Sequence, residues 1–219
     1  MPEPDLTFSS GQTYVAFSDL FGFKEMMKDR KEAYEALNYL FNSACALLQG
    51  NDNVKGLAVS DCVISWAVDS HLENIKDFIS NLHNKMIKKR YLMRTTIAFG
   101  EFRYEDRIEL SNLSKEMIWG GAYLTAYLAN EKAEIGSIVL VDDGLAETVQ
   151  RPNEGMWRKT KKPRGWEYFW SVDNPEQIER LIKKRKESHR GRYEWLKDIY
   201  QGRFHMSHVS DESRDSNRD

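Results

Sequence analysis

Apolar residues recur along the first fifty positions with two different periods, which predict a strand followed by helices. Residues 12–19 (QTYVAFSD) are rich in β-branched and aromatic side chains and predict a strand. Gly22 follows in a tight turn, and we expect a helix to start near Phe23. From Leu37 onward apolar side chains return every three or four positions, as on one face of a helix, until the turn residues from Gly50 end it.

The next segment predicts a β-hairpin and a second amphipathic helix. The runs 55–60 and 62–68 are short and rich in β-branched residues, so Asp61 is expected at the tip of a hairpin between them. Between positions 75 and 87 apolar residues recur with the helical period, and the basic run 88–90 marks the end of this helix.

The second half of the chain is predicted to add strands and helices in alternation. Residues 92–102 form another strand, in which Gly100 marks a close approach of backbone or ligand. Residues 118–130 begin with two glycines and predict a third helix. The remaining segments are predicted as a strand (137–141), a short helix (143–150), a basic loop broken by Pro and Gly (151–165), an aromatic strand (166–172) and a long charged helix (175–200).

This order of elements predicts an α+β fold of the ferredoxin-like β-α-β-β-α-β type, with a mostly antiparallel sheet covered by helices. We expect residues 1–172 to form one domain, with a C-terminal strand at its end. A long helix over 173–203 packs on it, and the polar residues 204–219 are expected to be a disordered tail.

Composition excludes several classes of protein. The 219 residues are 41% hydrophobic, which suffices for a sizeable core. The 32 basic and 34 acidic side chains leave a formal charge of −2, whereas nucleic-acid binders usually carry a basic excess. No apolar run reaches the roughly 18 residues of a membrane span, and no signal peptide is visible at the start. A cytoplasmic protein without nucleic-acid or membrane partners is expected.

Cysteine and histidine offer no chemistry of their own. Cys45 and Cys62 lie in apolar segments without metal-ligand spacing, so both are expected to be small buried side chains in a reducing compartment. The five histidines are scattered, which argues against zinc or a catalytic histidine.

Two aspartates are the candidates for chemistry. In a β-α-β-β order the first strand and the hairpin are neighbours, so Asp19 and Asp61 can converge. Convergent carboxylates bind hard divalent cations such as Mg²⁺, which usually takes one or two of its ligands from the protein. Amide groups in the turn after Asp19 would favour phosphate. The alternative is that each aspartate is an ordinary cap or turn residue.

Four short segments, in this order, resemble the motifs of the class III nucleotide cyclases over about residues 12–141. They are VAFSDLFGFKEMM (15–27), VSDCVISW (59–66), RTTIAFGEF (94–102) and IWGGAYLTAYLA (118–129). The resemblance implies a cyclase catalytic domain in which Asp19 and Asp61 bind two Mn²⁺ or Mg²⁺ ions, with the carbonyl of Leu20 as a further ligand. It implies that the turn formed by Phe21, Gly22 and Phe23 holds the phosphates of a nucleoside triphosphate. It also implies a homodimer with active sites at the subunit interface.

The departures from the family pattern concern the base. Leu57 and Met117 stand where purine cyclases read adenine with polar side chains, and Leu124 and Leu128 stand where the family has its transition-state Asn and Arg. This pattern is similar to the pyrimidine (uridylate or cytidylate) cyclases of bacterial Pycsar antiphage systems. We therefore expect CTP or UTP as substrate and a separate effector protein that responds to the cyclic product. A purine cyclase and a catalytically silent nucleotide-sensing module are the alternatives.

Arg94 is the candidate cation for the transition state, because it begins the strand that leads to the base pocket. We expect it to act with the base-contacting residues, opposite the metal ligands. Its alternative role is an arginine that pairs with a carboxylate. Tyr123 and Tyr127 lie one helical turn apart and either stack on the base or pack in the core. The weaker candidate cations are Lys24, Arg103 and Lys115.

Overall fold

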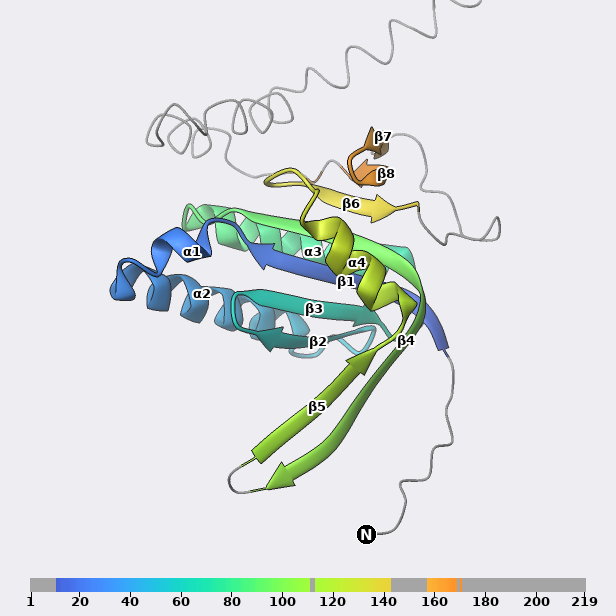
Figure 1. Ribbon diagram of the computed structural model, residues 1–219, viewed down its shortest axis with the longest axis horizontal. Helices are drawn as coiled ribbons and strands as arrows, with labels where there is room; N and C mark the ends of the chain where they lie inside the picture. The colour runs from blue at the N-terminus through green and yellow to red at the C-terminus, as the bar shows by residue number, and fades with distance from the viewer. Residues whose placement is uncertain (1–10, 111–112, 143–156, 169, 171–219) are drawn as a thin grey trace, which may run out of the picture.

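In the computed structural model the described residues are 11–110, 113–142, 157–168 and 170, and their strands form one twisted sheet (Figure 1). The strand order is β2-β3-β1-β4-β6-β8-β7, and β5 pairs with β4 off this path. Among the strands of the described residues, only the pairing of β4 with β6 is parallel. The α+β prediction is confirmed. The elements are β1 (Gly11–Leu20), α1 (Phe23–Met26), α2 (Arg30–Leu48), β2 (Val54–Val59), β3 (Cys62–Ala67), α3 (Leu72–Lys88), β4 (Met93–Leu110), β5 (Leu113–Trp119), α4 (Gly121–Asn130), β6 (Ile138–Val141), β7 (Trp157–Lys161) and β8 (Arg164–Tyr168).

Helices cover both faces of the sheet, and β1 supplies alternate side chains to each. Tyr14, Ala16 and Leu20 join the main core beneath α2 and α3. Val15 and Phe17 face the other way and join a smaller core beneath α4. This alternation follows from the two-residue period of a strand, and it explains why β1 is buried on both faces. Figure 1 shows α4 on the opposite side of the sheet from α2 and α3.

The two long helices differ in how well sequence periodicity predicts their buried faces. In α3 every apolar residue on the predicted face is buried: Ile75, Phe78, Ile79, Leu82, Met86 and Ile87. Helix α2 begins earlier than predicted, at Arg30, because the side chain of Asp29 caps it. Small residues such as Ala33 and Ala36 make its contact face, and this rotates Cys45 into solvent. The expectation that Cys45 is buried is therefore wrong.

The predicted hairpin is present, with Asp61 at its tip. Strands β2 and β3 are joined by Ser60 and Asp61 alone, and Val59 pairs with Cys62. Ser60 takes a left-handed conformation with φ 53°, as tight two-residue hairpins require.

The hairpin of β4 and β5 was missed by the sequence analysis. Strand β4 continues to Leu110 and pairs with β5, and Figure 1 shows this arm projecting from the body of the molecule. The segment 103–117 is rich in charged residues, and the period-two alternation of Tyr104, Ile108 and Leu110 is interrupted by Asp106. Its strands follow from pairing with each other.

The C-terminal part of the described chain contains one more strand than the sequence predicts. Residues 157–161 form β7, so the expectation of a continuous loop over 151–165 is wrong there. Trp157 of β7 is buried and joins the main core, which fixes the strand at the sheet edge. The predicted elements at 143–150, 173–203 and 204–219 lie outside the described residues. Within the described part of the chain, no helix is long and apolar enough to cross a membrane.

Candidate active site

Asp19 and Asp61 meet where β1 ends beside the tip of the β2–β3 hairpin. Asp19 is paired with Cys62 on one side and with Arg94 on the other. The amide of Leu20 donates to the carbonyl oxygen of Asp61 at 3.0 Å, which ties the hairpin tip to the strand end. The convergence that the topology predicts for the two aspartates is confirmed.

The side chain of Arg94 forms an ion pair with the side chain of Asp19 in the same chain. Its Nε and Nη2 atoms each lie 3.0 Å from Oδ2 of Asp19. The arginine side chain is 25% exposed and the aspartate side chain 19%. Arg94 is thus grouped with the metal half of the expected site. The expectation that it acts opposite the metal ligands is wrong, because β4 pairs directly with β1 and brings position 94 to position 19.

The electrostatics of this corner favour a bound cation. Burial raises the pKa of Asp19, Arg94 lowers it, and the nearby Asp61 raises it. The pKa of the Cys62 thiol rises to about 11 because of burial and the same two carboxylates. Each carboxylate therefore disfavours negative charge on its neighbours, and a cation between them would relieve that repulsion.

The donor set fits a magnesium or manganese ion. No group of three or more Asp, Glu, His or Cys side chains lies close enough to bind a metal among the described residues. Mg²⁺ usually takes only one or two carboxylates from the protein and completes its shell with water and substrate phosphates. Asp19 and Asp61 meet that requirement when a triphosphate supplies the rest.

The turn after β1 has the conformation that a glycine allows. Gly22 has φ 77°, a left-handed value that other residues rarely adopt. The amide of Phe21 donates to the carbonyl of Leu92 at 2.8 Å, so this amide is already used within the fold. Of the three amides expected to bind phosphate, those of Gly22 and Phe23 therefore remain as candidates.

An apolar hollow of about 420 Å³ opens on the α4 side of the sheet, the face that Phe17 and Asp19 share. It is lined by Phe17, Leu57, Val59, Cys62, Ile64, Ile118, Tyr123 and Tyr127. Three of the four expected base residues are therefore brought together. Met117 does not line the hollow. Its neighbour Ile118 does, because adjacent residues of β5 face opposite sides.

Aromatic rings form one wall of this hollow. The ring of Phe17 lies 5.2 Å from that of Tyr127 and 6.4 Å from that of Tyr123, between ring centroids. The two tyrosine rings stack 6.3 Å apart. The position of the two tyrosines is therefore compatible both with packing in the core and with stacking on a base, because their rings contact Phe17 of the smaller core and also line the hollow.

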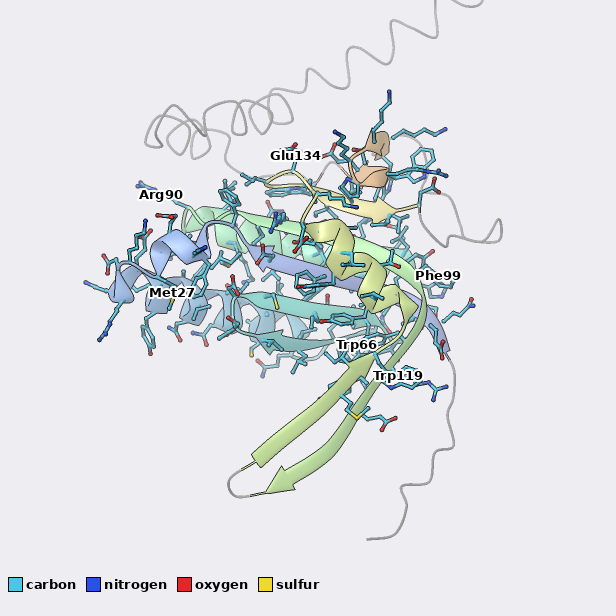
Figure 2. All side chains as sticks on the ribbon, viewed as in Figure 1. Met27, Trp66, Arg90, Phe99, Trp119 and Glu134 are labelled. Carbon is cyan, nitrogen blue, oxygen red and sulfur yellow. The ribbon has the colours of Figure 1, made fainter. Side chains whose placement is uncertain are left out.

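Two of the three weaker candidate cations have described side chains, and no contact with Asp19 or Asp61 is observed for either. Lys24 is exposed on α1. Arg103 lies over the ring of Trp119, 4.7 Å from its centroid, and pairs with Glu101 at the foot of the β4–β5 arm. Figure 2 shows Trp66 and Trp119 near this foot. The side chain of Lys115 lies outside the described residues.

Asn130 is a site residue that the sequence analysis missed. It ends α4 and is 2% exposed. Its side-chain amide donates to the carbonyl oxygens of Phe17 at 3.0 Å and Arg94 at 3.2 Å. A polar residue at the end of an otherwise apolar helical run was the available signal.

Comparison of the fold with solved structures gives consistent matches. The guanylate cyclase domain of RhGC from Catenaria anguillulae, solved in complex with GTP, is 17% identical with a TM-score of 0.53; the match covers 72% of this chain and 94% of that one. The guanylyl cyclase Cya2 is 13% identical with a TM-score of 0.53, over 74% and 94% of the two chains. The adenylyl cyclase CyaB from P. aeruginosa is 17% identical with a TM-score of 0.51, over 71% and 91%.

The fold is that of a nucleotide cyclase catalytic domain. No protein-family model and no curated protein matches the sequence. The cyclase fold is therefore established by structure, at a level of identity where substrate and activity have to be argued from the site itself.

Proposed function

We propose that this protein is a metal-dependent nucleotide cyclase that converts a nucleoside triphosphate to its 3′,5′-cyclic monophosphate and pyrophosphate. The observation that carries the proposal is the meeting of Asp19, Asp61 and Arg94 at one corner of the sheet, beside an apolar hollow on the same face. A structural role alone would not require a second carboxylate, Asp61, beside the half-buried Asp19, whose pKa it raises.

In the proposed reaction the ribose 3′-hydroxyl oxygen attacks the α-phosphorus as the bond to the bridging oxygen of pyrophosphate breaks, and the hydroxyl proton passes to water. Asp19 and Asp61, with the carbonyl of Leu20, would hold two Mn²⁺ or Mg²⁺ ions. Such ions, when bound, make the hydroxyl more acidic and neutralise the leaving pyrophosphate. The amides of Gly22 and Phe23 orient the phosphates, and the Arg94 guanidinium stabilises their developing charge.

The proposed substrate is CTP or UTP, with cyclic CMP or cyclic UMP as product. Leu57, which lines the hollow, can neither donate nor accept the hydrogen bonds that identify adenine, and Met117 lies outside the hollow. The hollow is lined mainly by apolar and aromatic side chains, and the polar side-chain groups of its lining residues are the thiol of Cys62 and the hydroxyls of Tyr123 and Tyr127. Large apolar side chains favour the smaller ring of a pyrimidine.

The proposed assembly is a homodimer with active sites at the subunit interface. It is supported by the exposed apolar side chains of Leu124, Tyr127 and Leu128 on α4, of which Tyr127 lines the hollow. By the resemblance to Pycsar cyclases, the product would act as a second messenger in antiphage defence. A separate effector protein would respond to it.

The test is incubation with each of the four ribonucleoside triphosphates and Mn²⁺, followed by chromatography of the products. The wild type should release cyclic CMP or cyclic UMP, and Asp19→Asn and Asp61→Asn should each lower the rate at least ~100-fold. Asp52→Asn, in an exposed turn, is the matched control and should keep full activity. Cyclic AMP or cyclic GMP alone would make this a purine cyclase. If no cyclic product formed from any of the four nucleotides, the protein would instead be a catalytically silent nucleotide-sensing module.

A further inference from the structure

Arg94 contacts one of the two carboxylate oxygens of Asp19, the proposed metal ligand. Both of its contacting nitrogens lie on the same oxygen of Asp19, Oδ2, at 3.0 Å each. A divalent ion bound to either oxygen of this carboxylate would stand within a few ångströms of the guanidinium charge, and like charges so close repel strongly in a half-buried site. The ion pair and the metal complex of Asp19 therefore compete.

The backbone of Arg94 is fixed in the sheet, whereas its side chain is held by the contact with Asp19 and is partly exposed. Position 94 is paired with position 19 in the sheet, and Asn130 donates to its carbonyl oxygen at 3.2 Å. The arginine side chain is still 25% exposed on the face that carries the hollow. A change of side-chain rotamer can therefore move the charge without moving the strand.

We infer that Arg94 is the resident counter-cation of Asp19, and that a divalent ion displaces it. The inference rests on the proposed metal site. In the metal-free protein the guanidinium neutralises a half-buried carboxylate that would otherwise lack a counter-charge. Once the ion takes over that role, the guanidinium is released beside it, where the phosphates of the substrate supply its next partner. Metal binding thus exposes the cation that a triphosphate needs.

The test is a titration of Mn²⁺ without nucleotide, followed by the electron paramagnetic resonance signal of the free ion at a fixed pH above neutrality. Arg94→Gln removes the competing charge and keeps a hydrogen-bond donor, so it should bind Mn²⁺ about tenfold more tightly than the wild type. Arg164→Gln is the matched control. It breaks another Arg–Asp contact of 3.0 Å, to Asp142, on a strand three places along the sheet from β1. Its Mn²⁺ affinity should equal that of the wild type.

Two further variants separate the possible failures. Arg94→Lys keeps the charge but loses the forked contact, so its affinity should lie between those of wild type and Arg94→Gln. Asp19→Asn should lose Mn²⁺ binding. If Arg94→Gln binds no more tightly than the wild type while Asp19→Asn loses binding, the displacement is refuted and the metal site stands. If Asp19→Asn binds as the wild type does, both the metal site and the displacement are refuted.

Discussion

His83 is a buried histidine whose surroundings keep it neutral. It is 2% exposed on α3, its Nε2 lies 2.8 Å from Oγ1 of Thr95, and the ring of Trp170 packs against it at 5.0 Å. Thr95 in turn donates to the hydroxyl of Ser18 at 2.8 Å, directly before Asp19 in β1. Burial lowers the pKa of His83 from 6.5 to about 3. This chain of polar groups packs α3 onto the strand that carries the site.

The depressed pKa predicts a specific loss of stability in acid. Below about pH 6.5 the unfolded chain binds a proton at this histidine and the folded chain does not, so stability falls as pH drops toward 3. Between about pH 7.5 and pH 5.0 this single group should cost ~2 kcal/mol of unfolding free energy. His83→Gln should remove that part of the pH dependence in urea melts at fixed protein concentration.

The control for this prediction is His71→Gln, at the exposed N-terminus of α3. It should show the same difference in unfolding free energy between the two pH values as the wild type. An unchanged difference in His83→Gln would mean that His83 is not held neutral in the fold.

At the scale of elements, two glycines set how closely α4 approaches the sheet. Gly120 has φ 129°, and a Cβ there would lie 2.2 Å from the carbonyl oxygen of Glu101 on β4. Gly100, with φ 154°, faces the backbone of Ala122 on α4. The close approach predicted at Gly100 is therefore to backbone. The turn at Gly120 allows β5 to pass into α4 directly above β4.

Gly120→Ala is therefore expected to be severe. The added methyl group meets backbone that cannot move away without opening the β4–β5 pairing, so the loss of unfolding free energy should be about 3 kcal/mol or more. Gly121→Ala is the matched control, because nothing lies within 4 Å of a Cβ at that position. It should be neutral or slightly stabilising in the same denaturation measurement. Equal effects of the two variants would contradict the close contact.

At the scale of the whole molecule, α4 presents apolar side chains that are exposed in the described part of the chain. Leu124 and Leu128 are 54% and 50% exposed, and Tyr127 lies between them at 41%. Leu124→Asp combined with Leu128→Asp should convert the proposed dimer to a monomer and abolish cyclisation, since no core contact is lost and only an interface is made polar. Sedimentation of wild type and variant measures the assembly directly.

The control is Val68→Asp, which changes another exposed apolar residue, 51% exposed, just beyond β3. It should leave the sedimentation of the protein unchanged. A wild type that sediments as a monomer at assay concentrations would contradict the proposed interface.

Mixed dimers test which residues share a subunit. Asp19 and Arg94 contact each other within one chain, so mixing Asp19→Asn with Arg94→Gln protomers leaves both sites damaged and should restore no activity. In the proposed dimer, the hollow of one subunit holds the base of the nucleotide whose phosphates lie at Asp19 and Asp61 of the partner subunit. Leu57→Glu places a charge in this hollow and therefore damages the partner's site. Mixing it with Asp19→Asn should restore about a quarter of the activity through one intact site in half of the dimers. If activity returned on mixing Asp19→Asn with Arg94→Gln, but not on mixing Asp19→Asn with Leu57→Glu, the assignment of Arg94 and Leu57 to the two halves of the site would be reversed.

Local sequence determined the elements that carry the aspartates. Strand β1, the turn at Gly22 and the β2–β3 hairpin are each specified by residues adjacent in the chain, through β-branched runs and turn chemistry. Their order then predicted that Asp19 and Asp61 converge. Helix α3 was equally predictable because its apolar face is wide and continuous.

Only the tertiary structure decided which residues contact one another in the site. Arg94 lies on Asp19 because β4 pairs with β1, a contact between residues that lie far apart in the sequence. Ile118 replaces Met117 in the hollow because pairing with β4 sets which face of β5 turns inward. Strands β5 and β7 depend on their pairing partners in the same way. Strand register and pairing arise from contacts between distant segments, which no local pattern of side chains encodes.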